Sequence, residues 1–450
     1  MMNSVLIFLV ALIFPALAFA QDTTRLKLLF VGDIMQHDSN IAASYNALTG
    51  KYDYSACFGY VSPIIKSADV AIGNLELTLA GSPYKGYPQF SAPDELAYEL
   101  KRIGFDVLVT ANNHSVDRGR KGIERTLDVL DTLALLHTGT FKDLMTRANA
   151  YPLLIEKNGF RISLLNCTYG TNGIPVPRPT IVNLIDTVQM KADLEKAKAQ
   201  HSDAIIVFMH WGDEYQSLPN KFQKRIADLC FREGAKLVIG SHPHVLQPIE
   251  WRKESDQLVA WSLGNFISGQ RPRYRDGGAM LWVDLQKIKT DSLSSTSVHQ
   301  AEYELEWVQK SNRGKKGFVM FPFRYFETDT SFIEDKMLRG AFEVFKTDAR
   351  TLYSKHNLGV TERAAAANLD SLQYAVCLGS FSDEQANALI DNDVLQGYGL
   401  ERTNHGEGHW LWYAGKFSDK TKAQEALLDM ETRTGILQMR VVKRMNENGN

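Results

Sequence analysis

The sequence is poor in the features that mark several large classes of protein. Its formal net charge is only −2 over 450 residues, so it carries no electrostatic footprint for nucleic acid and no support for a basic membrane-binding patch. The four cysteines form no Cys-x-x-Cys pair, and their pairing cannot be deduced from sequence. Beyond residue 20, no apolar run is long enough to span a membrane as a helix. The remaining composition, 44% apolar and 23% charged, is ordinary for a soluble globular protein of two or more domains.

The N-terminal 20 residues differ from the rest of the chain. Residues 5–14 are continuously apolar, and small residues at Ala18 and Ala20 follow. This order predicts a signal peptide cleaved after Ala20, and therefore export to a periplasm or cell envelope. No Lys or Arg precedes the apolar run, so an uncleaved N-terminal anchor is the alternative.

Strands and helices alternate over residues 25–330, as in a doubly wound α/β domain. Five apolar segments predict parallel strands, at residues 26–34, 69–73, 105–111, 204–209 and 235–239. Amphipathic patterns predict helices between them, at residues 97–103, 122–135, 183–199 and 222–231. Further strands are expected to form a second sheet packed on the first, at residues 258–262, 279–285, 303–308 and 317–321. Residues 331–370 are expected to be a helix and a linker.

Residues able to bind metals or move protons follow each of the five strands. The last strand is followed by Gly240-Ser241-His242-Pro243-His244, and two histidines two residues apart on extended backbone point the same way. The other four strand ends carry Asp33, Glu76, Asn113, His114, Asp117 and His210. Parallel strands of one sheet bring their carboxyl ends together, where open α/β sheets hold ligands. We therefore expect these side chains to meet in one site.

The set combines carboxylate, amide and imidazole groups, which suit divalent ions of the Mn, Fe or Zn type. A carboxylate can bridge two such ions, a geometry that activates water for an in-line displacement. The simpler interpretation is that each residue is a helix cap or a turn residue, as an aspartate after a strand usually is. Five strand ends that all carry such residues favour a two-metal site.

The same residues lie in motifs that resemble those of the CapA family, the poly-γ-glutamate capsule biosynthesis proteins related to calcineurin-like metallophosphoesterases. The motifs occur in order over residues 26–270, as GDI, GNLE, TANNHSVDRG, HWGDE, GSHPHVLQP and SLGNF. The resemblance implies a calcineurin-like sandwich of two packed sheets flanked by helices. It assigns metal binding to Asp33, Glu76, Asn113, His210, His242 and His244. It makes Glu76 the bridging ligand and His114 the acid that protonates a leaving group, oriented by Asp117.

One position departs from the phosphoesterase pattern. Phosphoesterases have a histidine two residues after the first aspartate, and this chain has Met35 there. His37 lies two residues further along and could not take the same place without a change of backbone. One metal site is therefore expected to be weakened or filled differently.

The resemblance implies a metal-dependent hydrolase or transferase that acts on an ester or amide. Its substrate would be an anionic polymer or a small molecule, and the CapA name implies a γ-linked glutamate polymer that is exported or anchored. The alternative is a non-catalytic envelope protein with a vestigial metal site, because of Met35.

The segment at residues 371–445 carries a two-fold pattern of its own. Strands are expected at 374–381, 410–417 and 436–442, and helices at 383–390 and 420–432. The pieces VCLGSF and YAGKF resemble SPOR domains, a family that binds peptidoglycan glycan strands. The resemblance implies a small α+β domain that targets the chain to the cell wall. The simpler interpretation is that Tyr374, Phe381 and Trp412 only form the apolar face of a small domain.

Overall fold

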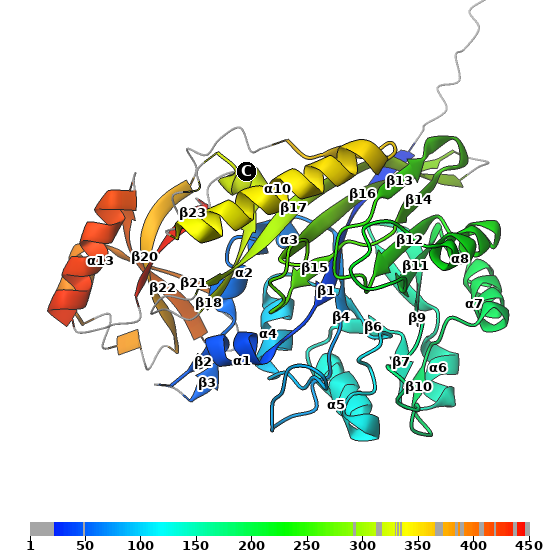
Figure 1. Ribbon diagram of the computed structural model, residues 1–450, viewed down its shortest axis with the longest axis horizontal. Coiled ribbons are helices and arrows are strands. Elements are labelled where there is room, and N and C mark those ends of the chain that lie inside the picture. The colour runs from blue at the N-terminus through cyan, green and yellow to red at the C-terminus, as the bar shows by residue number, and fades with distance from the viewer. Residues whose placement is uncertain are drawn as a thin grey trace, which may run out of the picture.

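The computed structural model describes most of the chain (Figure 1). The described residues are 22–47, 50–290, 294–311, 317–328, 330, 333, 335–364, 372–382, 386–387, 391–404, 409–417, 420–434 and 439–445. The signal peptide predicted at residues 1–20 lies outside them, as does most of the helix predicted at 383–390. Among the described helices, none has both the length and the apolar character needed to cross a membrane.

The first of two large sheets has nine strands, in which a parallel half continues into an antiparallel half (Figure 1). Its order is β18-β17-β16-β1-β4-β5-β6, with β15 paired to β1 and β19 to β17. The parallel half contains β1 (Asp22–Ile34), β4 (Val70–Leu75), β5 (Val107–Val109), β6 (Leu136–Thr138) and β15 (Asn265–Ile267). The antiparallel half contains β16 (Gly277–Lys289), β17 (Ser294–Ser311) and β18 (Gly317–Pro322), and β19 (Thr361–Glu362) pairs with β17 in parallel.

The second sheet has six strands in the order β13-β14-β12-β11-β9-β8. Its inner strands are parallel, namely β9 (Phe160–Thr168), β11 (Ala204–His210), β12 (Leu237–Ser241) and β14 (Gln257–Ala260). The edges are antiparallel, namely β8 (Leu153–Lys157) and β13 (Ile249–Arg252). Two-stranded sheets pair β2 (Tyr45–Asn46) with β3 (Lys51–Tyr52) and β7 (Thr140–Phe141) with β10 (Ile181–Val182). The mixed α/β class with two main sheets is confirmed.

Helices flank these sheets. They are α1 (Asp38–Ser44), α2 (Ser55–Phe58), α3 (Ser62–Lys66), α4 (Glu95–Arg102), α5 (Gly119–Thr132), α6 (Leu144–Ala150), α7 (Thr187–Ala199), α8 (Lys221–Arg232), α9 (Phe323–Phe326) and α10 (Lys336–His356). Side chains cap several of them: Asp186 accepts hydrogen bonds from the first turn of α7, and Asn220 accepts one from that of α8. α8 begins one residue before its predicted start at 222, whereas α7 begins four residues after its predicted start at 183.

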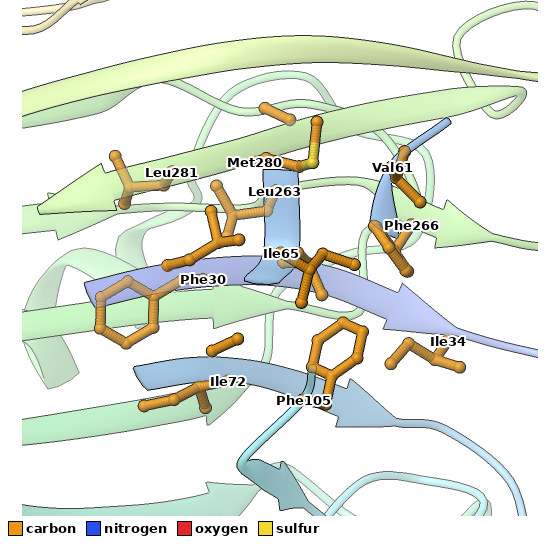
Figure 2. Close-up of a cluster of buried hydrophobic side chains, with 14 of the residues drawn as sticks. Phe30, Ile34, Val61, Ile65, Ile72, Phe105, Leu263, Phe266, Met280 and Leu281 are labelled. Carbon is orange, nitrogen blue, oxygen red and sulfur yellow. The ribbon is translucent and has the colours of Figure 1, made fainter. Parts of the chain in front are cut away.

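One large apolar cluster joins side chains of both sheets. Figure 2 shows part of it, including Phe30 and Ile72 from neighbouring strands. In β11, Phe208 packs in this cluster, whereas Val207 packs in a second cluster with residues of α7 and α8. Because successive side chains of a strand point to opposite faces, a strand buried on both faces is apolar throughout. This burial explains the continuous apolar run that predicted the strand.

The β-rich stretch after residue 258 does not form a sheet of its own, so that expectation was wrong. β14 joins the second sheet beside β12, and β16, β17 and β18 extend the first sheet beyond β1. The predicted parallel strands also divide between the sheets, because β11 and β12 belong to the second. Local patterns predict that a strand forms, but its sheet is decided by pairing between distant segments.

The C-terminal residues form a four-stranded antiparallel sheet of order β21-β22-β20-β23. Its elements are β20 (Leu372–Ser382), α12 (Asp393–Gly397), β21 (Leu400–Asn404), β22 (His409–Phe417), α13 (Lys420–Thr434) and β23 (Arg440–Met445). Val376, Trp412 and Met430 belong to the apolar cluster between this sheet and its helices. A small α+β unit is therefore present.

Glu306 on β17 is a fully buried carboxyl group, and neither of its carboxylate oxygens has a hydrogen-bond partner within the described residues. Burial raises its pKa well above the ordinary value, although the nearby Arg271 opposes the shift. Above a pH of about 4.3, Glu306 therefore loses its proton in the unfolded chain but keeps it in the folded chain. Glu306 thus lowers the stability of the fold, and this effect grows as the pH rises.

We expect Glu306→Gln to raise the free energy of unfolding by about 1–3 kcal/mol at pH 8 and to change it little at pH 4. The reason is that glutamine has no proton to release. Denaturant unfolding of both proteins between these pH values measures the difference. A difference that stays constant with pH would contradict the raised pKa.

Candidate metal centre

The predicted site residues meet where the carboxyl ends of the two sheets face each other. In the first sheet, β1 carries Asp33, β4 leads to Glu76, and β5 leads to Asn113, His114 and Asp117. In the second sheet, β11 ends at His210, and β12 leads to His242 and His244. All eight side chains are buried. The site therefore lies between two sheets, whereas the sequence led us to expect the edge of one.

Asp33 reaches the site through an irregularity in β1. The pairing of β1 with β4 shifts register between Phe30 and Asp33, and such irregularities re-aim side chains. A Cβ atom on Gly32 would lie 2.0 Å from the carbonyl oxygen of Gly264, so only glycine allows this approach. The backbone N–H of Asp33 then donates to the same carbonyl oxygen at 2.9 Å.

Two overlapping groups of side chains have donor atoms within 4.8 Å of one another, as a metal site requires. One group is Glu76, His242 and His244, and the other is Asp33, Glu76 and His210. Nδ1 of His244 lies 3.1 Å from Oδ2 of Asp33, and Nε2 of His210 lies 3.5 Å from Oε1 of Glu76. Glu76 belongs to both groups, so it would be the shared ligand if both groups held an ion.

Glu76 shows that the site suits cations. Neither of its carboxylate oxygens has a hydrogen-bond partner within the described residues. Burial and the adjacent carboxylate of Asp33 raise the pKa of Glu76 well above its ordinary value. A buried carboxylate with no partner costs several kcal/mol, and a bound divalent cation would remove this cost. The residues present therefore fit divalent metal ions.

Two of the histidines, His210 and His242, are in the protonation state that metal binding needs. Burial, with neighbouring imidazoles, lowers the pKa of His210 and of His242 well below the ordinary value. Both rings are therefore neutral near pH 7 and offer a lone pair, as a metal ligand must. Nδ1 of His242 is also buried with no hydrogen-bond partner in the described part of the chain.

The backbone at the histidine pair is not extended, contrary to our expectation. His242 has a φ of +99° and His244 a φ of +57°, in a region that sterics disfavour for residues other than glycine. Their rings still approach each other, with 5.9 Å between centroids. The N–H of Tyr215 donates to the carbonyl of Pro243 at 2.8 Å and holds the turn. Strain of this kind persists where the surroundings enforce it, typically at binding sites.

Asn113 lies within reach of the same cluster. Its Oδ1 atom lies 2.7 Å from Nε2 of His210, and its Nδ2 atom donates to Oδ1 of Asn172 at 3.2 Å. The ring of Tyr169 packs on His242 with 4.5 Å between centroids. The structure therefore brings all six predicted ligands together.

His114 and Asp117 form a separate pair beside the cluster. Nδ1 of His114 lies 2.8 Å from Oδ2 of Asp117, which also accepts a hydrogen bond from the N–H of Phe90 at 2.7 Å. The edge of the His114 ring packs against Phe90, with 4.6 Å between centroids. A carboxylate that accepts from Nδ1 fixes the ring so that Nε2 can exchange a proton.

Several supporting residues were not predicted. Nδ2 of Asn74 donates to Oδ1 of Asp33 at 2.8 Å, and Oγ of Ser241 lies 3.0 Å from Nδ1 of His210. Oδ1 of Asn265 lies 3.1 Å from Nδ1 of His244. Such outer contacts orient metal ligands. Each residue lies inside one of the quoted motifs (GNLE, GSHPH and SLGNF), and this position was the only sequence signal for it.

Met35 and His37 stand apart from the cluster. Met35 is 2% exposed and packs in the large apolar core. Nδ1 of His37 accepts a hydrogen bond from the N–H of Gly269 at 3.1 Å. Burial, with His244 nearby, lowers the pKa of His37 to about 4. Neither residue belongs to the two donor groups, so the position filled by histidine in phosphoesterases supplies no ligand here.

Comparison with known families now identifies the chain. The model of the bacterial capsule synthesis protein family PGA_cap matches residues 27–270, more than half of the sequence. The chain belongs to this family. Its match includes every residue of the metal cluster and the His114–Asp117 pair.

Two curated relatives carry capsule-related names. The capsule biosynthesis protein CapA of Bacillus anthracis is 29% identical over 262 residues, covering 56% of this PGA_cap chain and 61% of that protein. The PGA biosynthesis protein CapA of Bacillus subtilis (strain 168) is 29% identical over 300 residues, covering 64% of this chain and 76% of that protein. The chain thus spans less than two thirds of the Bacillus anthracis relative.

Solved structures give weaker likenesses. The calcineurin-like phosphoesterase YfkN from Bacillus subtilis aligns over 63% of this chain and 91% of its own, with 14% identity and a TM-score of 0.40. The NAD nucleotidase of Haemophilus influenzae aligns over 78% of this chain and 66% of its own, with 12% identity and a TM-score of 0.40. Membership of the PGA_cap family and the buried carboxylate–imidazole set fit a metal-dependent hydrolase or transferase.

Proposed function

We propose that this PGA_cap protein is an exported, metal-dependent hydrolase or transferase that acts on an ester or amide of an anionic envelope polymer. The observation that carries the proposal is Glu76, a buried carboxylate without a hydrogen-bond partner in the described residues, shared by two donor groups. The names of the family and of its CapA relatives support a capsule polymer of the poly-γ-glutamate type.

The proposed ligands are Asp33, Glu76, Asn113, His210, His242 and His244, which would hold two divalent ions of the Mn, Fe or Zn type. Bound ions of this kind supply Lewis-acid polarisation of the ester or amide that reacts. This assignment is supported by the neutral imidazoles of His210 and His242 and by Glu76, whose carboxylate oxygens have no hydrogen-bond partner among the described residues.

His114 would supply the proton. Its Nδ1 lies 2.8 Å from Oδ2 of Asp117, so Nε2 is the ring atom that would give a proton from the charged ring to a departing oxygen or nitrogen. Asp117 is the positioning residue, because it fixes the ring and would stabilise its charged form. Packing against Phe90 keeps the ring in one orientation and excludes water from one side.

A metal-removal experiment tests the proposed reaction. γ-Glutamyl amides and phosphoesters are incubated with the full chain before and after chelation, and after addition of Mn²⁺, Fe²⁺ or Zn²⁺. We expect chelation to abolish turnover of at least one substrate class and one of the ions to restore it. Absence of turnover with every ion, in protein that holds no metal, would favour the non-catalytic envelope protein.

We further propose that residues 25–330 form the catalytic unit, 331–370 a helix and linker, and 371–445 a SPOR-like unit that binds peptidoglycan glycan strands. The four-stranded sheet supports this assignment, and on it the guanidinium of Arg402 lies 3.9 Å from the ring centroid of Trp410. Aromatic rings and a cation on one sheet offer stacking and hydrogen bonds to a sugar chain. Failure of the full chain to sediment with peptide-free glycan strands would contradict this part of the proposal.

A further inference from the structure

A pocket of about 250 Å³ lies beside α10, the long yellow helix near β16 and β17 (Figure 1). Its wall combines side chains of α10 with those of three loops, which contribute Ser217, Leu246 and Tyr274. This volume is just below the range of pockets that hold drug-sized ligands, so it suits one small group of a longer molecule. Nothing in the proposed metal chemistry uses it.

Two residues of the pocket lining are close in sequence to residues at the metal centre. Leu246 follows the ligand His244 by two residues, and Ser217 follows Tyr215, whose ring lies 6.1 Å from the His244 ring. Next to Tyr274, the guanidinium of Arg275 lies 3.2 Å from the centroid of the Tyr215 ring.

We call this stacked pair the Tyr215–Arg275 ridge. Hydrogen bonds to the backbone hold it in place. Nδ2 of Asn265 donates to the carbonyl of Arg275 at 2.8 Å, while its Oδ1 contacts His244. Tyr215 and Tyr274 both have positive φ, of +66° and +75°, a strained form that is retained where loops are held at binding sites. The ridge is therefore anchored to the histidine turn through Asn265.

The pocket has an apolar floor and a positive edge. Leu246, Phe345, Ala349 and Leu352 supply aliphatic and aromatic surface. The one carboxylate in the lining, Asp348, is already paired with Arg273 by two contacts of 2.7 Å.

Lys355 and His356 lie at the other end of the lining, in the last turn of α10. Lys355 is exposed and has no ion pair among the described residues. An apolar floor beside an unpaired cation matches a carboxylate on a short aliphatic stem.

We infer that this pocket is a second subsite for the polymer, holding an aliphatic carboxylate unit one or more repeats away from the bond at the metal centre. The inference rests on the proposed function. The chain of the polymer would cross the Tyr215–Arg275 ridge, its stem lying on Leu246 and Leu352 and its carboxylate facing Lys355. A substrate longer than one unit therefore gains contacts that a single unit lacks.

The test measures binding of γ-linked glutamate oligomers of one to four residues to the metal-loaded full chain by calorimetry, in a His114→Ala background that prevents turnover. We expect affinity to rise with oligomer length. Lys355→Glu should weaken binding of the longer oligomers about three- to tenfold, and the effect should be larger at low salt. The affinity for a single glutamate should not change. Ser217→Trp places a large ring in the pocket and should also weaken binding of the longer oligomers without changing the affinity for a single glutamate.

Lys336→Glu is the matched control, because it reverses an exposed lysine at the opposite end of α10 and should change nothing. If Lys355→Glu, Ser217→Trp and their parent bind the long oligomers equally well, the subsite assignment is wrong. The proposed metal centre would be unaffected by this result. Binding of no oligomer by metal-loaded protein would overturn both the subsite and the proposed substrate class.

Discussion

Replacing His114 by alanine is expected to lower turnover of the proposed reaction by about 10²–10⁴-fold while leaving the metal content unchanged. The imidazole is buried, paired with Asp117 through Nδ1, and belongs to neither donor group of the metal cluster. Its loss therefore removes the proton donor without removing a ligand. Steady-state kinetics and elemental analysis of the same preparations measure the two effects. Unchanged turnover with full metal content would contradict the assignment of His114.

Asp117→Asn separates positioning from proton transfer. Asparagine keeps the shape of the side chain but presents a weaker acceptor to Nδ1 of His114, so we expect kcat to fall and KM to stay the same. His201→Ala is the control for loss of a histidine, because His201 is an exposed residue after α7 and should change neither constant. A rise in KM alone for Asp117→Asn would indicate a role in substrate binding.

Replacing Glu76 by glutamine is expected to abolish the dependence of thermal stability on metal. In the parent protein, ions at a thousand times their dissociation constant stabilise the fold by about 4 kcal/mol, so a chelator should lower the Tm by roughly 10 °C. The variant lacks the shared carboxylate and should show almost no response. Without metal it should be at least as stable as the parent, because it no longer buries an unpaired carboxylate.

Glu99→Gln is the matched control for this experiment. Glu99 is buried like Glu76, but Arg102 contacts both of its carboxylate oxygens. Its replacement should destabilise the fold with and without metal, and the response to the chelator should remain. Differential scanning calorimetry distinguishes the two variants. A parent protein that melts at the same temperature with and without chelator would refute the role given to Glu76.

Much of the candidate site could be predicted from sequence because each proposed ligand lies at or just after the end of a recognisable strand. The apolar runs before His210 and before Gly240-Ser241 predict strands that end at the site without any long-range information. The residue types then indicate the kind of site, because carboxylates and imidazoles that gather at strand ends suit a metal ion. The structure brings all of these side chains together.

What sequence patterns could not supply is the pairing between distant segments. β1 and β11 have the same apolar character, yet they belong to different sheets, because partner choice depends on the whole chain. The left-handed backbone at His242 was likewise missed, since it is enforced by contacts such as the bond between Tyr215 and Pro243. The supporting role of Asn74 depends on the same long-range packing.

The most direct test of a divalent metal centre is elemental analysis of the purified full chain beside an Asp33→Ala/His244→Ala double variant. Each donor group loses one member in this variant, so both sites should fail. We expect about two equivalents of Mn, Fe or Zn in the parent protein and almost none in the variant. A parent protein without bound metal, or a variant that keeps the parent's metal content, would contradict it.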